Sequence, residues 1–287
     1  MRPLNVLVTG ATGFVASHLI PHLERSGHTV IAAGHDAARI PSGQGITPLL
    51  WDHTLPPPEL PSAPDAIIHL AQANVPFPAR AGEMFAVHVA ATHHLLEFAR
   101  KRGTKRFVFT STGSVYGPGD RLWSEDDPAE GPGYYAATKV AAERLIRAYG
   151  DLVPHTIFRL FAPYGPGQRN RLIPGLINRV QNATPVIVAG GQGPAFNPIH
   201  VEHVVSALEQ SLHASGNQLL NLAGDEALTV REMTVIIGRA LGKEPVIQDQ
   251  PGTADRFVGA TSRLRQAYRL PERLISFEVG IRSMVTA

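Results

Sequence analysis

The stretch between Leu4 and Leu19, LNVLVTGATGFVASHL, constrains the fold of this chain more than any other. It opens with a short apolar run, residues 4–9, which has the length and the β-branched content of a buried strand. Gly10, Thr12 and Gly13 follow, and then apolar side chains recur at helical spacing. A strand that turns tightly into a helix directs backbone N–H groups out of the helix N-terminus, where a pyrophosphate can bind. The stretch therefore predicts a strand, a nucleotide-binding turn and a helix, with an ordinary turn containing two glycines as the alternative.

Strands and helices alternate along most of the chain. We expect strands over residues 4–9, 28–33, 46–50, 65–71, 106–110, 155–160 and 218–223, and helices over residues 85–100, 134–149 and 197–212. Alternation at this spacing predicts an α/β fold with a doubly wound parallel sheet of the Rossmann type. Beyond Phe161 the chain is less regular and prolines are spaced through it.

Composition excludes several functional classes. Hydrophobic residues make up 44% of the chain and charged residues 17%, which is typical of a globular protein. The formal net charge is only +2 and no run of Lys or Arg suggests a nucleic-acid site, so we expect no nucleic-acid partner. The absence of cysteine excludes disulfides, thiolate nucleophiles and Cys-ligated metals. No apolar run has membrane-spanning length and the first strand leaves no room for a cleaved signal, so we expect a cytoplasmic enzyme with a small-molecule substrate.

Three polar residues follow strands or lie on helices where ligands bind in such a sheet. Thr112 comes just after the strand at residues 106–110, and Tyr135 and Lys139 are four residues apart, which places them on one helical face. A nearby ammonium favours the phenolate and moves a tyrosine toward a pKa suited to proton transfer at neutral pH. The alternative, an exposed helix pair, is common for a Tyr-x-x-x-Lys motif alone. The combination with the glycine turn and the Ser/Thr-rich strand end favours the catalytic interpretation.

These motifs together resemble those of a known family. TGATGFVASHL, IIHLAQ at 67–72, FVFTSTGSVYG at 107–117, YYAATK at 134–139 and YGPGQ at 164–168 are similar to the motifs of the extended short-chain dehydrogenases/reductases of the epimerase/dehydratase type. The resemblance extends from about Leu4 to Leu212 and implies NAD or NADP bound to an N-terminal domain, with a smaller lobe over the substrate. On this basis we assign residues 1–161 and about 196–223 to the NAD(P)-binding domain. About 162–195 and 224–287 would form the substrate lobe.

The resemblance also implies a role for each matching residue. It makes Tyr135 the general acid and base, Lys139 the residue that tunes it and binds ribose, and Thr112 the hydroxyl that holds the substrate oxygen. The residues implied in cofactor binding are Gly10, Thr12, Gly13, Phe14, Val15, His35, Arg39, Asp52, His53, Leu70, Ala71, Gln72, Tyr135 and Lys139. Those implied in substrate binding are Thr112, Ser114, Phe161, Ala162 and Phe196. The helices at 85–100 and 134–149 are the faces that the family uses for dimers, so a homodimer is expected.

Two departures from the family pattern concern the cofactor side. Where the family usually has an acid for the adenosine ribose, this chain has Gly34, followed by His35 and later Arg39. An acid there would repel a 2′-phosphate, so its absence favours NADP, whereas Asp36 could still serve NAD. His88 occupies a position where the family often has Asn. It could relay protons, or it could be a structural histidine.

The substrate lobe departs further. Nucleotide-sugar enzymes of the family commonly grip the diphosphate with an Asn and two arginines, and our alignment puts Ala162, Phe196 and Gln250 at those places. None of the three carries a charge, which favours a smaller or uncharged substrate. Arginines that could substitute are Arg169, Arg171, Arg179 and Arg256.

Two reactions known in the family lack their usual residues in this chain. Gly113 and Ser114 replace the Asp-Glu pair of the family's dehydratases, and the cysteine of epimerases that act beside a keto group is absent. Hydride transfer at a carbinol or keto carbon of a non-nucleotide compound remains the favoured reaction. A C4-type nucleotide-sugar epimerase is the first alternative and an inactive NAD(P)-binding sensor the second. His200 and His203 flank Glu202, but no third ligand is apparent and the spacing suits the start of a helix, so no metal site is expected.

Overall fold

The computed structural model of the chain describes residues 2–60 and 62–285 and divides into two compact units. Unit 1 takes in the chain up to Val115, then Ala129–Arg159 and Val205–Leu220. Unit 2 takes in Tyr116–Pro128, Leu160–Val204 and the chain from Asn221 onward. The segment Tyr116–Pro128, which the sequence analysis placed in the N-terminal domain, thus belongs to unit 2.

The principal sheet has seven strands in the order β11-β6-β5-β4-β1-β2-β3. Their bounds are β1 (Asn5–Thr9), β2 (Thr29–Gly34), β3 (Ile46–Leu50), β4 (Ala66–His69), β5 (Arg106–Thr112), β6 (His155–Leu160) and β11 (Gln218–Leu222). The five strands β1 to β5 run parallel. All four residues of β4 are buried, as expected for a parallel strand covered on both faces. The α/β prediction of a doubly wound sheet is therefore confirmed.

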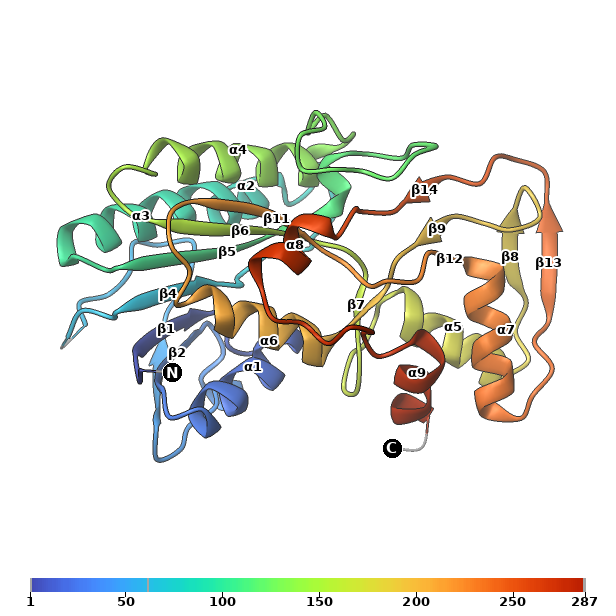
Figure 1. Cartoon of the computed structure of the whole chain (residues 1–287), viewed down its shortest axis with the longest axis horizontal. Helices are drawn as coiled ribbons and strands as arrows, with labels where there is room; N and C mark the ends of the chain where they lie inside the picture. Colours follow the sequence, from blue (N-terminus) through green and yellow to red (C-terminus); the bar gives the residue numbers. More distant parts are fainter. Residues whose placement is uncertain (1, 61, 286–287) are drawn as a thin grey trace. The chain divides into compact units, whose positions relative to one another are not determined.

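Helices cover both faces of this sheet (Figure 1). On one side lie α2 (Ala81–Phe85), α3 (Ala91–Arg102) and α4 (Tyr134–Ala148), and on the other lie α1 (Phe14–Arg25) and α6 (Val201–Ser211). Helix α1 buries Ala16, Leu19, Ile20 and Leu23, which recur at the three- and four-residue spacing of one helical face. The expected helix at 85–100 is divided, because a π-helical turn, Ala86–Ala90, separates α2 from α3.

Unit 2 has a core of its own. Its helices are α5 (Leu172–Gln181), α7 (Val230–Leu241), α8 (Ser262–Ala267) and α9 (Phe277–Val285). Its short strands are β7 (Pro163–Tyr164), β8 (Val186–Ala189), β9 (Ala195–Phe196), β10 (Ile199–His200), β12 (Leu228–Thr229), β13 (Ile247–Gln250) and β14 (Arg256–Phe257). Helix α7 packs against α5 and α9, and Tyr164, Met233 and Phe277 meet in the core.

The predicted helix at 197–212 begins later than expected. Residues 199–200 form β10, which pairs with β7, and α6 starts at Val201. Asn197 is buried, and its side-chain amide donates to the carbonyls of Gly224 and Gly259. This residue therefore ties together loops of unit 2, which keeps the segment before Val201 extended.

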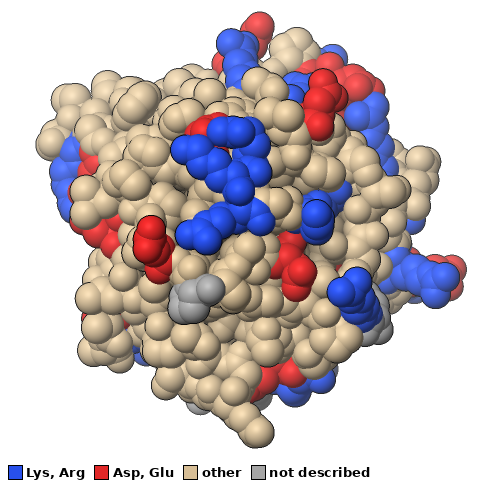
Figure 2. All heavy atoms as spheres, turned by 90° about the vertical axis from the view of Figure 1, so that its left-hand side faces the viewer, with Lys and Arg blue, Asp and Glu red and all other residues tan. Residues whose placement is uncertain are grey.

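Charge on the surface is mixed. On the face drawn in Figure 2, Lys and Arg side chains lie beside Asp and Glu, with uncharged side chains over most of the remainder. The last turn of α3 contributes Arg100, Lys101 and Arg102, and Glu97 forms ion pairs with the first two of these. Basic side chains at a helix C-terminus interact favourably with the helix dipole, so this cluster has a structural explanation.

Candidate active site

The glycine turn between β1 and α1 brings two strand ends close together. Gly10 has a φ of +69°, and a Cβ on it would lie 2.8 Å from the backbone nitrogen of Ala71. Only glycine allows the loops after β1 and β4 to approach so closely. Gly13 precedes α1 without a side-chain cap, and the first turn of the helix has no acidic residue. The N–H groups of Phe14 and Val15 lack intrahelical acceptors there, so the turn fits the pyrophosphate of a dinucleotide.

The end of β2 presents a cation rather than an acid. A Cβ on Gly34 would lie 3.1 Å from side-chain carbons of Thr12 and Ile40. The exposed Arg39 donates from Nη2 to the carbonyl of Thr12 at 3.1 Å, and both line a cavity of about 360 Å³ beside α1. Asp36 caps the short 3₁₀ turn Ala37–Arg39 by accepting from Ala38 N–H at 3.2 Å, while His35 is exposed.

After β3, the two residues predicted to contact the cofactor differ in exposure. Asp52 is exposed, and its carboxylate accepts from the backbone and the hydroxyl of Thr54, which lowers its pKa. His53 is buried, stacks on Trp51 with the ring centroids 4.5 Å apart, and accepts the N–H of Gly10 at 3.3 Å. Burial lowers the pKa of His53 to about 4, so it is neutral at pH 7. His53 therefore supports the glycine turn from within unit 1.

The predicted catalytic groups of unit 1 come from β5 and α4, which pack against each other. At the end of β5, the Thr112 hydroxyl accepts the backbone N–H of Ser114 at 3.2 Å and donates to its Oγ, also at 3.2 Å. Tyr135 lies in the first turn of α4, and its hydroxyl donates to Gln72 Oε1 at 3.2 Å. Gln72 follows Leu70 and Ala71 in the loop after β4, so the loop predicted to face the nicotinamide also meets the predicted acid/base.

Lys139 lies one turn farther along α4 and is only 1% exposed. Its Nζ donates to the carbonyl of Thr110 at 3.0 Å and lies 4.7 Å from the centroid of the Phe109 ring. Burial lowers the pKa of Lys139 to about 7, with Glu143 opposing the shift. This amine is therefore balanced between its two protonation states at neutral pH.

A buried ion pair lies one further turn along α4, and sequence reasoning missed it. Glu143 accepts from Arg159 of β6 at 2.7 Å and from the Ser111 hydroxyl at 2.5 Å. Both charged side chains are almost wholly buried, at 2% and 3% exposed. Because Ser111 precedes Thr112, this network fixes the end of β5 against α4. A glutamate four residues after the lysine, on the same helical face, was the signal in the sequence.

The predicted substrate residues are divided between the two units. Thr112 and Ser114 belong to unit 1, whereas Phe161, Ala162 and Phe196 belong to unit 2. Phe161 is buried against Gly259, where a Cβ would lie 2.7 Å from the ring. Ala162 has a φ of +36°, which is rare for a residue with a side chain. Phe196 stacks on Phe257 with the ring centroids 5.4 Å apart and an interplanar angle of 9°.

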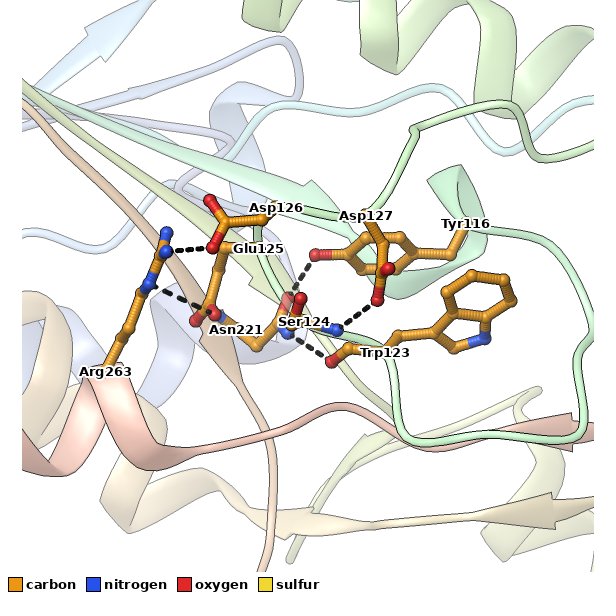
Figure 3. Close-up of polar contacts among 8 residues, drawn as sticks. All are labelled: Tyr116, Trp123, Ser124, Glu125, Asp126, Asp127, Asn221 and Arg263. Atoms are coloured by element: carbon orange, nitrogen blue, oxygen red, sulfur yellow. Dashed lines mark hydrogen bonds and ion pairs between the residues drawn. The ribbon is translucent and has the colours of Figure 1, made fainter.

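The loop Tyr116–Pro128, which lies in sequence between Thr112 and Tyr135, is held within unit 2 by a polar network (Figure 3). Asn221 is its centre: it donates from its backbone to Glu125 at 2.7 Å and from its amide to the carbonyl of Trp123 at 2.9 Å. Its Oδ1 accepts from Tyr116 at 2.8 Å, and Arg263 pairs with Asp126. Sequence reasoning did not identify Glu125 or Asn221, because their partnership depends on residues far apart in the chain.

The two histidines near Glu202 have structural partners. His203 accepts the backbone N–H of Ile275 at 2.8 Å, and the His200 ring meets the Tyr164 ring edge to face at 5.4 Å. Within residues 2–60 and 62–285, no group of three or more His, Cys, Asp or Glu side chains is arranged to hold a metal ion. Over the same residues no helix is long and apolar enough to cross a membrane.

The chain is similar in sequence and in fold to several known proteins. The sequence model of the NAD dependent epimerase/dehydratase family matches residues 6–223. A dTDP-4-dehydro-6-deoxy-D-allose reductase of Streptomyces bikiniensis is 29% identical, over 95% of this chain and 91% of that protein. A 3-diazoavenalumate denitrifying reductase of a Streptomyces species is 28% identical, over 89% of this chain and 88% of its own length. The solved structure of MoeE5 in complex with UDP-glucuronic acid and NAD has a TM-score of 0.86 and 28% identity, covering 98% of each chain.

Proposed function

The chain belongs to the NAD-dependent epimerase/dehydratase family of extended short-chain dehydrogenases/reductases, and on that premise we propose that it is a reductase or dehydrogenase of a small compound without a nucleotide. The reaction would be hydride transfer at a carbinol or keto carbon. The observation that carries the substrate class is the Phe196–Phe257 stack, which occupies a position where the family resemblance leads us to expect an arginine.

The residues of unit 1 support a simple division of work. Gly10, Thr12 and Gly13 would hold the pyrophosphate at the turn before α1, and the nicotinamide would supply hydride-transfer chemistry when bound. The Thr112 hydroxyl holds the substrate oxygen, and the Tyr135 hydroxyl moves a proton to or from that oxygen. Lys139, on the same face of α4, favours the phenolate when it is protonated. The fully buried lysine and the glycine turn support these roles, which mutagenesis can test separately.

For the cofactor we propose NADP, with NAD as the alternative. Arg39 is exposed and anchored to the glycine turn through Thr12, which suits a 2′-phosphate. Asp36, the acid that could serve NAD, is engaged in capping the 3₁₀ turn. The structural relative MoeE5 was solved with NAD, so direct titration of both reduced cofactors is required.

We infer the substrate class from the lack of charge at the three positions of unit 2 where related nucleotide-sugar enzymes bind a diphosphate. A diphosphate binds best to cationic, bidentate donors such as arginine. Here Phe196 forms an aromatic stack, Ala162 has no donor side chain, and Gln250 is exposed on β13 without a charge. Loss of two charge-assisted contacts costs about 3–6 kcal/mol, or roughly two to four orders of magnitude in affinity.

A C4-type nucleotide-sugar epimerase is the second candidate, because relatives favour it. MoeE5 binds UDP-glucuronic acid, and the Streptomyces bikiniensis relative is named for a dTDP-sugar. By contrast, another relative is named as a 3-diazoavenalumate denitrifying reductase, and that name contains no nucleotide. An inactive sensor is disfavoured, because Tyr135 and Lys139 are both retained.

The deciding experiment is a substrate screen. UDP-, GDP- and dTDP-sugars and a set of simple ketones are tested with NADH and NADPH, by calorimetry for binding and by absorbance at the nicotinamide band for turnover. We expect NADPH oxidation with a ketone and no nucleotide-sugar binding in the micromolar range. Micromolar binding of any of the nucleotide sugars would transfer the assignment to the epimerase.

Two variants sharpen this screen. Tyr135→Phe removes only the hydroxyl, so turnover should fall by about 10²–10⁴ while NADPH binding is retained. Phe196→Arg combined with Ala162→Asn restores the donors expected of a nucleotide-sugar enzyme and should raise the affinity for UDP at least about tenfold. Unchanged UDP affinity would show that these positions do not face a diphosphate.

We further propose a homodimer through the exposed faces of α3 and α4. The Tyr149 hydroxyl, just after α4, donates to Glu97 of α3 at 2.8 Å and joins the two helices into one surface. Sedimentation of the purified chain at several concentrations would test the dimer, and a monomer at all of them would reject it.

A further inference from the structure

A closed circuit of hydrogen bonds surrounds Tyr135 within unit 1. The first part runs from the side chain: the Tyr135 hydroxyl donates to Gln72 Oε1 at 3.2 Å. The next residue in the loop, Ala73, donates its backbone N–H to His88 Nε2 at 3.1 Å. The loop that carries Gln72 is therefore attached to a buried histidine.

The second part of the circuit returns to Tyr135. Because His88 Nε2 accepts from Ala73, its proton lies on Nδ1, which donates to Thr138 Oγ1 at 2.9 Å. Thr138 in turn donates to the carbonyl of Tyr135 at 2.9 Å. Both ends of the circuit thus lie on Tyr135, one at its hydroxyl and the other at its backbone.

The backbone around His88 is adapted to this contact. His88 is wholly buried and belongs to the π-helical turn Ala86–Ala90, a feature found in proteins mostly at functional positions. Its ring meets the Tyr135 ring edge to face, with centroids 5.4 Å apart and an angle of 81°. Both ring nitrogens are occupied by protein groups, so His88 has no nitrogen with which to relay a proton.

We propose that Gln72 is a positioning residue that sets the orientation and the pKa of the Tyr135 hydroxyl, and that His88 holds Gln72 in place. An acceptor on the phenol proton favours the protonated form. Gln72 thereby favours the protonated form of Tyr135, the form that donates a proton, until the loop moves away or a ligand takes the place of Gln72. The inference deepens the proposed reaction and rests on Tyr135 being its acid/base.

Other titratable groups face the same region. Lys139 lies on the Tyr135 face of α4, and Glu143 follows one turn later. His88 faces Tyr135 from the π-helical turn, and His69 of β4 is buried near Lys139 and His88. Gln72, unlike these groups, does not titrate, and its side chain is exposed, so it can be changed without disturbing the core.

The test is a direct titration of Tyr135 by NMR in protein labelled at the tyrosine phenolic carbon, with the Tyr135→Phe spectrum assigning the signal. Gln72→Glu should raise the pKa of Tyr135 by about one or more, because a like charge disfavours the phenolate. Gln72→Ala should lower that pKa, since the phenol loses the acceptor that Gln72 provides and water can solvate the phenolate. Gln44→Glu adds the same charge before the N-terminal end of β3, away from the carboxyl ends of the strands, and should leave the pKa unchanged.

The role of His88 is tested by two variants in the Gln72→Glu background. His88→Gln can keep an acceptor at the Nε2 position for Ala73, and the raised pKa should persist. His88→Asn reaches only the Nδ1 position, so the loop is released and the pKa should return toward the wild-type value. The titration needs neither cofactor nor substrate, so it is independent of whether the proposed reaction is correct. An unchanged pKa of Tyr135 in Gln72→Glu would overturn the proposal for Gln72, and equal values in the two His88 variants would overturn that for His88.

Discussion

Replacing Lys139 by methionine should stabilise unit 1 while it abolishes catalysis. The Lys139 amine is 1% exposed, and burial lowers its pKa from 10.5 to about 7. Each pKa unit corresponds to about 1.36 kcal/mol, so the charged form costs roughly 5 kcal/mol at low pH. Methionine removes this cost but leaves the Thr110 carbonyl without its donor, which costs about 1–3 kcal/mol. The net stabilisation expected at pH 6 is therefore roughly 2–4 kcal/mol.

The free energy of unfolding should depend on pH in the wild type but not, through this position, in Lys139→Met. Between pH 7 and 10.5 the unfolded chain binds more protons at Lys139 than the folded chain does, so stability rises with pH in this window. From pH 6 to pH 9 the wild type should gain about 3 kcal/mol from this group, and Lys139→Met should gain none. The advantage of the variant should accordingly shrink, and at pH 9 it should be near zero.

Urea unfolding at pH 6 and pH 9 is the appropriate assay. The chain has two tryptophans, Trp51 in unit 1 and Trp123 in unit 2, so fluorescence can follow each unit. Trp123 Nε1 has no hydrogen-bond partner among the described residues, and Trp123→Phe provides a background in which Trp51 alone reports. A destabilised Lys139→Met at pH 6, or a difference from the wild type that is the same at both pH values, would refute the reasoning and place the folded-state pKa of Lys139 near its ordinary value.

Three further predictions follow from single contacts. Arg39→Ala should weaken NADPH binding by about tenfold or more in a fluorescence titration and leave NADH binding unchanged, and equal effects on both cofactors would exclude a 2′-phosphate contact. Ala162→Gly should raise the free energy of unfolding by roughly 0.5–1 kcal/mol because glycine relieves the positive φ, whereas Ala137→Gly in the first turns of α4 should lower it by up to about 1 kcal/mol; a loss of stability in both would show that Ala162 is not strained. Glu143→Ala should cost about 3–5 kcal/mol by leaving Arg159 buried without its carboxylate, and Glu97→Ala, which breaks a surface pair, should cost far less; similar losses in both would contradict the buried network.

The sequence was most informative where local chemistry decides the structure. The strand, glycine turn and helix from Asn5 to Arg25 were predictable because Gly10 and the apolar spacing of α1 are local signals. Helix α7 carried such a signal too, a capping box between Thr229 and Glu232, but it was not used in the prediction. The chain beyond Phe161 was predicted to be irregular, so most of the regular structure of unit 2 was missed.

Contacts between distant segments could not be read from the sequence. His53 was predicted at the cofactor, and the bond that it accepts from the N–H of Gly10 depends on how the chain after β3 approaches the turn after β1. The π-helical turn at His88 likewise depends on Ala73 and Thr138, which are far from it in the chain. The roles of Thr112, Tyr135 and Lys139 remain predictions, supported by the geometry of unit 1.

The position of β11 at the edge of the principal sheet has a consequence for synthesis. Strand β6 is its only neighbour in that sheet, among the described residues, and five of the six β6 residues are buried. A chain that stops before Gln218 lacks β11, so β6 becomes an uncovered edge whose unpaired backbone groups are a template for intermolecular strand pairing. Truncated products and nascent chains of this protein are thus expected to aggregate until β11 has emerged from the ribosome and paired with β6.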